Sequence, residues 1–107
     1  MFIIAWEYQV KPEKQAEFKT IYFPNGEWVK LFNQGDGYLG TELLRDETNP
    51  RRYLTIDRWN SKEEYEAFLS QWEMEYKALD AQCEGLTESE SLIGKWTRYS
   101  KLAGIKS

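Results

Sequence analysis

The chain has 107 residues, enough for one domain with a modest core and too few for two. Apolar residues make up 41% and charged residues 30%, a balance typical of folded domains rather than disordered or membrane proteins. The net charge of −4, with Lys and Arg scattered along the chain, argues against binding to nucleic acid. No histidine is present, which excludes His-based triads and His-ligated zinc or haem.

Cysteine and aromatic content narrow the classes further. A single cysteine, Cys83, excludes disulfide frameworks and thiolate metal sites within one chain. The apolar run from Phe2 to Trp6 is too short for a signal peptide or a membrane span, so the default expectation is a cytoplasmic protein without membrane contact. Aromatic residues reach 16%, more than a small core readily covers, which favours a pocket and a homodimer interface.

The first third of the chain predicts a strand and a broken helix. Aromatic and β-branched residues alternate with period two from Phe2 to Val10, which indicates a strand. Helical spacing begins at Lys11-Pro12-Glu13, where Pro suits the first turn. Pro24-Asn25-Gly26 interrupts this helix, and a second short piece follows before Gln34 to Gly37 ends it. The apolar face of the two pieces consists of Phe18, Ile21, Tyr22, Trp28, Leu31 and Phe32.

The remainder predicts a hairpin, a long helix and a last strand. Residues 38–47 and 52–59 alternate as strands around the turn-rich 48–51, and Gly40 indicates a bulge or a close approach by another group. Ser61, with Glu64 three residues later, predicts a helix cap. One long amphipathic helix ends at Gly85, residues 87–90 form a short capped turn, and 92–99 form the final strand. The stripe of this helix consists of Tyr65, Phe68, Leu69, Trp72, Tyr76, Leu79 and Cys83.

The order β-α-β-β-α-β predicts a ferredoxin-like α+β sandwich, with both helical segments on one face of a four-stranded antiparallel sheet. Residues 1–100 form the single domain in this interpretation, and 101–107 form a flexible C-terminal tail. The opposite face of the sheet is left bare but is not uniformly polar. Two such sheets packed face to face would cover it, as in a dimeric α+β barrel.

Together with this order of elements, three sequence segments resemble the antibiotic biosynthesis monooxygenase (ABM) family. They are the strand from Gly37 to Asp46, the strand from Tyr53 to Trp59, and Ser61 followed by Tyr65-Glu-Ala-Phe68. The resemblance covers about residues 2–99. It implies a dimeric α+β barrel, and the best-understood members oxidise aromatic polyketides such as anthrones to quinones without metal, flavin or haem.

The resemblance also implies an active site. Trp59 matches a Trp at the end of the third strand, and Tyr65 matches a Tyr six residues later. A family Asn four residues before the Trp is replaced by Thr55, which still donates one hydrogen bond. The catalytic candidates are therefore Trp59, Tyr65 and Thr55, and the expected pocket residues are Trp6, Tyr8, Phe68 and Trp72. A haem-degrading branch of the family uses an axial His, and its absence here argues against that activity.

The leading hypothesis is a cofactor-independent monooxygenase acting on a small aromatic or polyketide-type molecule, with a non-catalytic ligand-binding or dimerisation module as the alternative. Trp59 and Tyr65 are as consistent with packing as with catalysis. Asp57 and Arg58 point to opposite faces of their strand, and structural ion pairs with Glu7, Glu42 or Arg45 are more typical than catalytic roles. Cys83 is expected to be a buried small hydrophobe.

Overall fold

The structure is a computed structural model that describes residues 1–101 and 104. Short 3-10 turns, η1 (Pro12–Lys14) and η2 (Glu84–Leu86), precede the first helix and follow the last. The predicted tail lies outside the described residues apart from Lys101 and Gly104. The strands are β1 (Phe2–Val10), β2 (Tyr38–Arg45), β3 (Arg52–Trp59) and β4 (Thr87–Thr97), and the helices are α1 (Gln15–Tyr22), α2 (Glu27–Phe32), α3 (Lys62–Gln71) and α4 (Glu73–Cys83).

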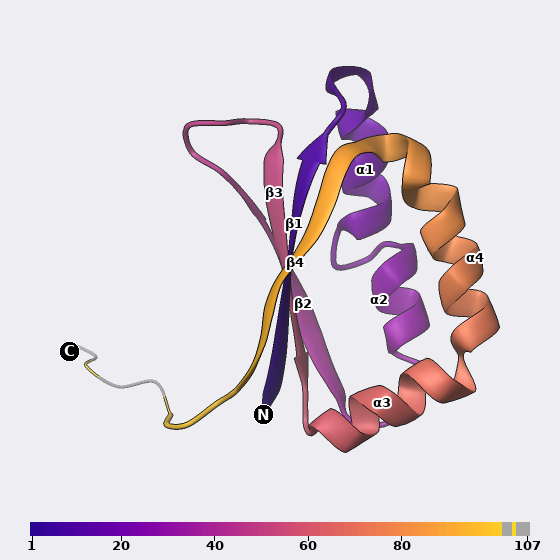
Figure 1. Ribbon diagram of the computed structural model, residues 1–107, viewed down its shortest axis with the longest axis vertical. Helices are drawn as coiled ribbons and strands as arrows, with labels where there is room; N and C mark the ends of the chain where they lie inside the picture. Colours follow the sequence, from indigo (N-terminus) through magenta and orange to yellow (C-terminus); the bar gives the residue numbers. More distant parts are fainter. Residues whose placement is uncertain (102–103, 105–107) are drawn as a thin grey trace.

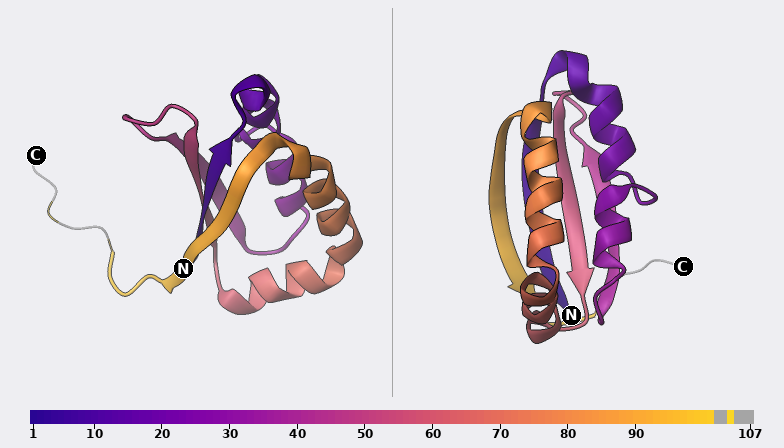
Figure 2. Two further views of the ribbon diagram at one scale, coloured as in Figure 1. Left: turned by 45° about the horizontal axis from the view of Figure 1, so that its top comes forward. Right: turned by 90° about the vertical axis from the view of Figure 1, so that its right-hand side faces the viewer.

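The four strands form one antiparallel sheet in the order β2-β3-β1-β4. All four α-helices lie on one face of this sheet, and no helix or strand of the described residues covers the other face (Figures 1 and 2). This confirms the ferredoxin-like α+β fold. The predicted break between α1 and α2 is also confirmed: it contains Gly26, where a Cβ would lie 2.3 Å from the Ile21 carbonyl oxygen. Gly40 has φ 144° at a register shift between β2 and β3, as the predicted bulge requires.

Two predicted elements are wrong. The segment 87–90 is not a capped turn but the start of β4, because Val10, Gln9 and Tyr8 pair with Thr87, Ser89 and Glu90. Apart from Thr87, this segment contains only Glu and Ser, which do not favour strands, but backbone pairing with β1 outweighs propensity at a sheet edge. The strand also ends at Thr97 rather than at residue 99.

The long helix predicted after Ser61 is divided in two at Trp72, whose φ of −112° and ψ of 27° are not helical. No Pro or Gly lies between Lys62 and Cys83, so the local sequence contains no helix breaker. At about 1.5 Å per residue, a straight helix of this length would span more than about 30 Å. The bend instead lets Phe68 on α3 and Tyr76 on α4 both pack against the core.

The Ser61 cap forms as predicted. Its hydroxyl oxygen accepts the backbone N–H of Glu64 at 3.1 Å and donates to the Glu64 carboxylate at 3.0 Å. Asn60 donates to the same carboxylate, at 2.9 Å. The cap therefore begins α3 directly after β3 and fixes the aromatic residues of α3 above the end of that strand.

The helix-facing side of β3 carries large side chains at its ends and short polar ones between them. Tyr53 and Trp59 at its two ends are large, whereas Thr55 and Asp57 between them are short. All four side chains are buried. On the adjacent strand β2, Thr41 lies opposite Asp57 and adds a third short side chain. The middle of the sheet therefore offers less side-chain volume to the helices than either end.

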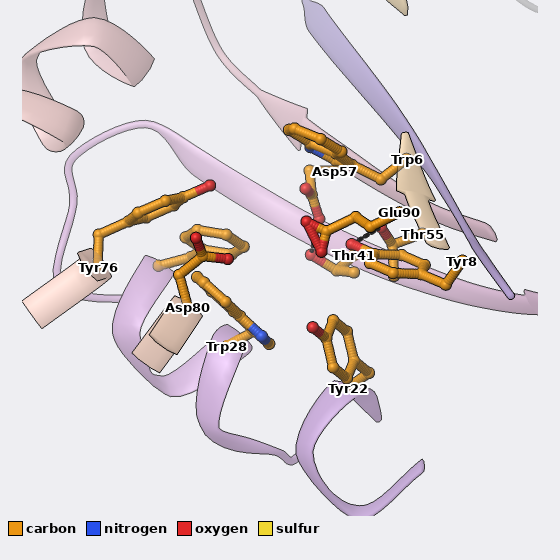
Figure 3. A pocket seen from close by; sticks show the side chains of 11 residues that line it. Trp6, Tyr8, Tyr22, Trp28, Thr41, Thr55, Asp57, Tyr76, Asp80 and Glu90 are labelled. Carbon is orange, nitrogen blue, oxygen red and sulfur yellow. Dashed lines mark hydrogen bonds between the residues drawn. The ribbon is translucent and has the colours of Figure 1, made fainter. Parts of the chain in front are cut away.

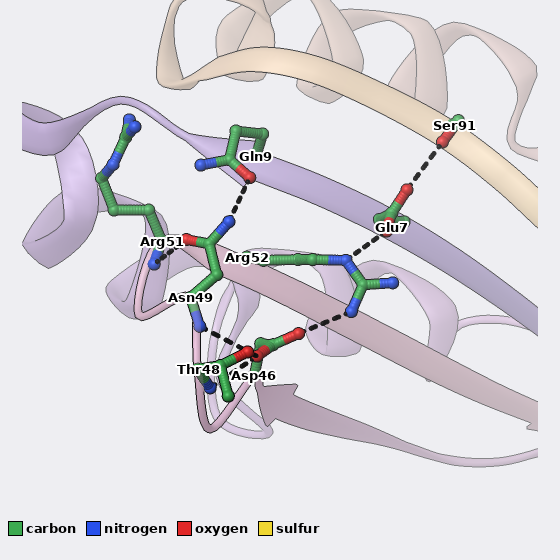
Figure 4. A network of polar contacts seen from close by, with 8 residues as sticks. All are labelled: Glu7, Gln9, Asp46, Thr48, Asn49, Arg51, Arg52 and Ser91. Atoms are coloured by element: carbon green, nitrogen blue, oxygen red, sulfur yellow. Dashed lines mark hydrogen bonds and ion pairs between the residues drawn. The ribbon is translucent and has the colours of Figure 1, made fainter.

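The open face of the sheet carries paired charges. Arg52 contacts the carboxylates of Glu7 and Asp46, the latter at 2.7 Å, and Arg58 contacts Glu42 at 2.5 Å (Figure 4 shows the Arg52 network). Three hydrogen bonds from the backbone and side chain of the adjoining turn, together with the one from Arg52, hold the pKa of Asp46 well below its usual range. The Arg58 pair with Glu42 was among those expected from the sequence.

Apolar side chains share this open face with the ion pairs. By strand alternation, Ile3, Leu54 and Ile56 point away from the helices, and none of them is fully buried. Trp96 on β4 is 48% exposed, and its ring lies over Gly94, where a Cβ would approach it to 2.9 Å. The face is thus part apolar and part charged, as the sequence predicts.

Candidate functional site

A cavity lies between the sheet and the helices, above the short side chains of β2 and β3 (Figure 3). It encloses about 430 Å³ including its mouth, but only about 30 Å³ of this is wide enough for the centre of a water molecule. This space is smaller than an aromatic ring, so a ring-sized ligand would require the wall side chains to move apart. The lining residues are Trp6, Tyr8, Tyr22, Trp28, Phe32, Thr41, Thr55, Asp57, Tyr76, Asp80 and Glu90.

Aromatic rings from several elements form most of the wall. The ring centroids of Tyr8 on β1 and Tyr22 on α1 lie 5.0 Å apart, edge to face. Trp28 on α2 meets Tyr76 on α4 in the same manner at 5.1 Å. Such pairs are rigid and present both apolar faces and polar hydroxyls to a ligand. Figure 3 shows the hydroxyls of Tyr22 and Tyr76 directed toward the space between the rings.

Asp57 is the buried charge of this cavity. Only 6% of the residue is exposed, and burial raises the pKa of its carboxyl to about 6, although a hydrogen bond from Thr41 opposes the shift. Neither Glu7, Glu42 nor Arg45, the partners expected from the sequence, contacts it. Among residues 1–101 and 104, no Lys or Arg forms an ion pair with Asp57. A buried carboxylate without a cation lowers the stability of the fold, and such groups cluster at functional sites.

A chain of hydroxyl groups supports Asp57 from β2. The Thr41 hydroxyl donates to Oδ1 of Asp57 at 2.7 Å. Because that hydroxyl has only one hydrogen, its 2.5 Å contact with the Tyr38 hydroxyl makes Tyr38 the donor. The other oxygen, Oδ2, accepts no hydrogen bond from the described part of the chain. One carboxylate oxygen is thus held in place while the other is free for a ligand.

Two further carboxylates, Asp80 on α4 and Glu90 on β4, line the cavity at exposed positions. Burial raises the pKa of Glu90, and repulsion from Asp80 raises it further. Burial raises the pKa of Tyr76 most, followed by the nearby Tyr65. The negative charges of Asp80, Asp57 and Glu90 raise that pKa further, so all three acids act on this one hydroxyl group. The cavity is therefore lined by negatively charged groups, from the exposed Asp80 and Glu90 to the buried Asp57.

The residues predicted from sequence divide into two groups. Thr55, Trp6 and Tyr8 line the cavity, and Tyr8 and Thr55 share a hydroxyl–hydroxyl contact of 3.2 Å. Trp59 and Tyr65 lie close together, with ring centroids 5.6 Å apart, but they are not among the lining residues.

Trp59 is completely buried, and the residues around it are aromatic. Its ring contacts Phe32, Tyr38, Tyr65 and Phe68 at centroid distances of 5.2–5.9 Å. Phe68 therefore packs in the core, and Trp72 borders a surface groove between α2 and α4 instead of the cavity. The structure thus brings Thr55, Trp6 and Tyr8 to the cavity and keeps Trp59, Tyr65, Phe68 and Trp72 apart from it.

Asp57 is the residue that sequence reasoning missed as a site candidate. Its signal was present: an acidic residue on the buried face of a central strand, flanked on that face by Thr55 and Trp59. A partner for its charge was assumed on the neighbouring strands. Alternation in fact places Glu42 on the open face, and Thr41 meets Asp57.

Comparison with known proteins identifies the family of this chain. The model of the family described as antibiotic biosynthesis monooxygenase matches residues 1–75. The chain belongs to this family. No curated protein sequence matches the chain.

Solved structures related to this family member share its fold. A candidate antibiotic biosynthesis monooxygenase from Deinococcus radiodurans has a TM-score of 0.77 at 16% identity, covering 99% of this chain and 100% of that one. SnoaB, a cofactor-independent oxygenase from Streptomyces nogalater, has a TM-score of 0.73 at 18% identity, covering 96% and 97%.

A haem-type ligand appears in another relative of the fold. A variant of MhuD with two manganese protoporphyrin IX molecules per active site has a TM-score of 0.68 at 17% identity, covering 97% of this chain and 100% of that one. At these identities the likeness establishes the fold and not the ligand. The fold therefore occurs both in a cofactor-independent oxygenase and in a protein that binds a porphyrin.

Two negative findings concern the described residues. None of their helices is long and apolar enough to cross a membrane. Within the same residues, no group of three or more His, Cys, Asp or Glu side chains is arranged to hold a metal ion.

Proposed function

We propose that this ABM-family protein is a cofactor-independent monooxygenase that oxidises a small aromatic substrate with molecular oxygen, and that Asp57 is its base. The observation that carries the proposal is a buried carboxylate, with one free oxygen, opening onto an aromatic cavity. A carboxyl pKa near 6 makes Asp57 a stronger base than an ordinary aspartate while leaving it mostly ionised at neutral pH. Such a group suits the removal of a proton from an activated C–H or phenolic O–H bond.

The proposed reaction on an anthrone-type methylene begins with proton transfer to Asp57. The electron pair of the C–H bond stays on the ring system as a carbanion, so the net charge of the cavity does not change. The carbanion passes one electron to oxygen, and the resulting radical and superoxide combine to form a C–O bond. The peroxide takes the proton back from Asp57, and loss of water, with the second methylene proton, leaves a carbonyl. One CH₂ group and one O₂ thus give one C=O group and one water.

The residues named by the family resemblance take supporting roles in this proposal. Thr55 lies on the cavity floor and can donate its hydroxyl hydrogen to the oxygen adduct. Trp59 and Tyr65 act as positioning residues, because Trp59 packs against Phe32, which lines the cavity, and against Tyr38, which donates to Thr41.

The test is oxygen uptake with a panel of anthrones and hydroquinones, with uptake in the absence of protein subtracted. We expect Asp57→Asn to lower the rate by about 100-fold or more, the range typical of a lost general base. Asp36→Asn removes the same charge at an exposed position and is the matched control. Uptake that survives Asp57→Asn but is abolished by Trp59→Phe or Tyr65→Phe would move the reacting centre to those residues. No uptake with any substrate would favour the ligand-binding module.

We also propose that the protein is a homodimer joined through the open face of the sheet, the arrangement that the resemblance implies. Apolar area on this face comes from Ile3, Leu54, Ile56 and Trp96. The charged residues between them are already paired with one another, Arg52 with Glu7 and Arg58 with Glu42. Light scattering at micromolar concentration should give twice the chain mass. Ile56→Lys should yield monomers, whereas Met74→Lys, at a residue 82% exposed on α4, should not. A wild-type monomer would contradict this proposal.

A further inference from the structure

The charged side chains that line the cavity are all acidic. Its lining contains six aromatic residues, two threonines and three acids, and neither Lys nor Arg. The chain as a whole carries 14 Lys and Arg, so their absence from the lining reflects placement rather than composition. The three carboxylates of the lining would repel a carboxylate or phosphate ligand.

None of the three acids is neutralised by the protein. The described residues form seven ion pairs, and Asp57, Asp80 and Glu90 take part in none of them. Lys77, one turn before Asp80 on α4, pairs with Glu73 instead, at 2.8 Å. Elsewhere on the molecule, by contrast, Arg52 and Arg58 neutralise the acids of the open face. The cavity is therefore a place where negative charge is left for something else to compensate.

Asp57 shows that this charge is directed inward. It is more than nine-tenths buried, lines the cavity floor, and has one carboxylate oxygen with no hydrogen bond from the described residues. The rings of Trp28 and Tyr76 in the cavity wall pack edge to face, with their centroids 5.1 Å apart. A cation within about 6 Å of such ring faces gains attraction from their π electrons. Acidic side chains and aromatic rings together are the pattern that recognises an organic ammonium ion.

We infer that the cavity takes an aromatic molecule bearing a protonated primary amine, with the ammonium group at the mouth between Asp80 and Glu90 and the ring directed toward Asp57. This inference names the ligand class of the cavity used in the proposed function. It concerns binding and does not depend on the reaction with oxygen.

Calorimetric titration with three matched probes tests the inference. These are 2-phenylethylammonium, the neutral 2-phenylethanol and the anionic 3-phenylpropionate. We expect the ammonium to bind at least about tenfold more tightly than the alcohol, with no detectable binding of the carboxylate. Equal binding of ammonium and alcohol, binding of the carboxylate, or no binding of the ammonium at millimolar concentration would each overturn the inference.

Paired substitutions separate the local effect from that of net charge. Asp80→Asn combined with Glu90→Gln should abolish the preference for ammonium over alcohol, and both positions are exposed enough for the fold to tolerate the change. Asp36→Asn combined with Glu63→Gln removes the same charge elsewhere and should preserve the preference. Loss of the preference in both double variants would contradict a local site.

Oxygen uptake distinguishes this inference from the proposed function. If the protein binds the ammonium probe and consumes no oxygen with any substrate, the inferred ligand class is supported and the proposed oxygenase function is contradicted. If the protein oxidises neutral anthrones and binds the three probes alike, the proposed oxygenase function is supported and the inferred ligand class is contradicted.

Discussion

The end of the helix–sheet interface at Trp59 and its middle at Asp57 are both rich in aromatic residues, yet one is filled and the other is hollow. At the end, four rings surround Trp59, which has no exposed surface. In the middle, Thr41, Thr55 and Asp57 are too short to reach the rings on the helices, and the cavity opens above them. The difference shows that short residues on a buried strand face mark a cavity better than large aromatic ones.

The two regions also differ in how they treat polar atoms. In the filled end, the indole nitrogen of Trp59 is buried without a hydrogen-bond partner, as is that of Trp28 in the cavity wall. In the middle, the Asp57 carboxylate receives a hydrogen bond from Thr41, which is itself supported by Tyr38. An organised donor chain to a buried carboxylate is typical of functional sites, whereas an isolated indole N–H is consistent with packing. The comparison therefore assigns stability to the Trp59 end and chemistry to the Asp57 region.

The largest effect that would test this assignment is the loss of Trp59. Trp59→Ala should lower the free energy of unfolding by about 3–5 kcal/mol, because it leaves a large void in a filled core. Urea denaturation measures this, and Tyr99→Ala, at a fully exposed position, is the control with little expected change. A cost below about 1 kcal/mol for Trp59→Ala would mean that this end of the interface is not filled.

Asp57 should behave in the opposite way. Its folded-state pKa of about 6 exceeds the ordinary value of 3.8, so the folded state binds the proton more tightly, and stability falls as pH rises from about 4 to above 6. Asp57→Asn removes this penalty and should stabilise the protein at pH 7 by up to about 3 kcal/mol, and by little at pH 4.

Urea denaturation of both proteins between pH 4 and pH 8 measures the difference, with Asp36→Asn as the control for charge. A variant less stable than the wild type at pH 7 would show that Asp57 makes a stabilising contact and is not a penalised buried acid.

Removal of the Thr41 hydroxyl sharpens the comparison within the cavity. The hydrogen bond from Thr41 lowers the pKa of Asp57, so Thr41→Val should raise that pKa above about 6, by about one unit. Carbon-detected NMR titration of the Asp57 carboxyl measures it directly. Thr20→Val, at an exposed helical position, should leave the titration unchanged. An unchanged midpoint in Thr41→Val would remove Thr41 from the support of Asp57.

The smallest effect concerns the cap that holds α3 over the filled end. Ser61→Ala removes the acceptor for the Glu64 backbone N–H and should cost about 1 kcal/mol of stability. Ser70→Ala, at an exposed position within the same helix, should be nearly neutral. Chemical denaturation compares the two, and equal costs would show that the cap contributes nothing beyond helix propensity.

Much of the fold follows from local patterns in the sequence. Alternation defined β1 and the hairpin, Pro24 to Gly26 located the break before α2, Gly40 located the bulge, and Ser61 located the start of α3. These features depend on backbone conformations and side-chain periodicities that a residue and its near neighbours determine. The start of β4 and the bend at Trp72 were missed because pairing with β1 and packing against the core decide them.

The candidate site was less accessible from the sequence. The resemblance pointed to Trp59, Tyr65 and Thr55, and of these the tertiary structure brings only Thr55 to the cavity. Asp80 and Glu90 are ten residues apart on a helix and a strand, and nothing in their local sequence indicates that they line the same cavity as Asp57. Whether a charge is paired depends on which strands and helices lie beside it, and that is a property of the complete fold.

The sequence by itself determined the alternation that buries Tyr53, Thr55, Asp57 and Trp59 on one face of β3, because strand geometry sends every second side chain the same way. Only the tertiary structure decided what each of them meets there. Helices α2 and α3 supply rings that enclose Trp59, whereas over Thr55 and Asp57 the helices stand too far away for short side chains to reach. The carboxylate was thus left facing a space instead of a partner.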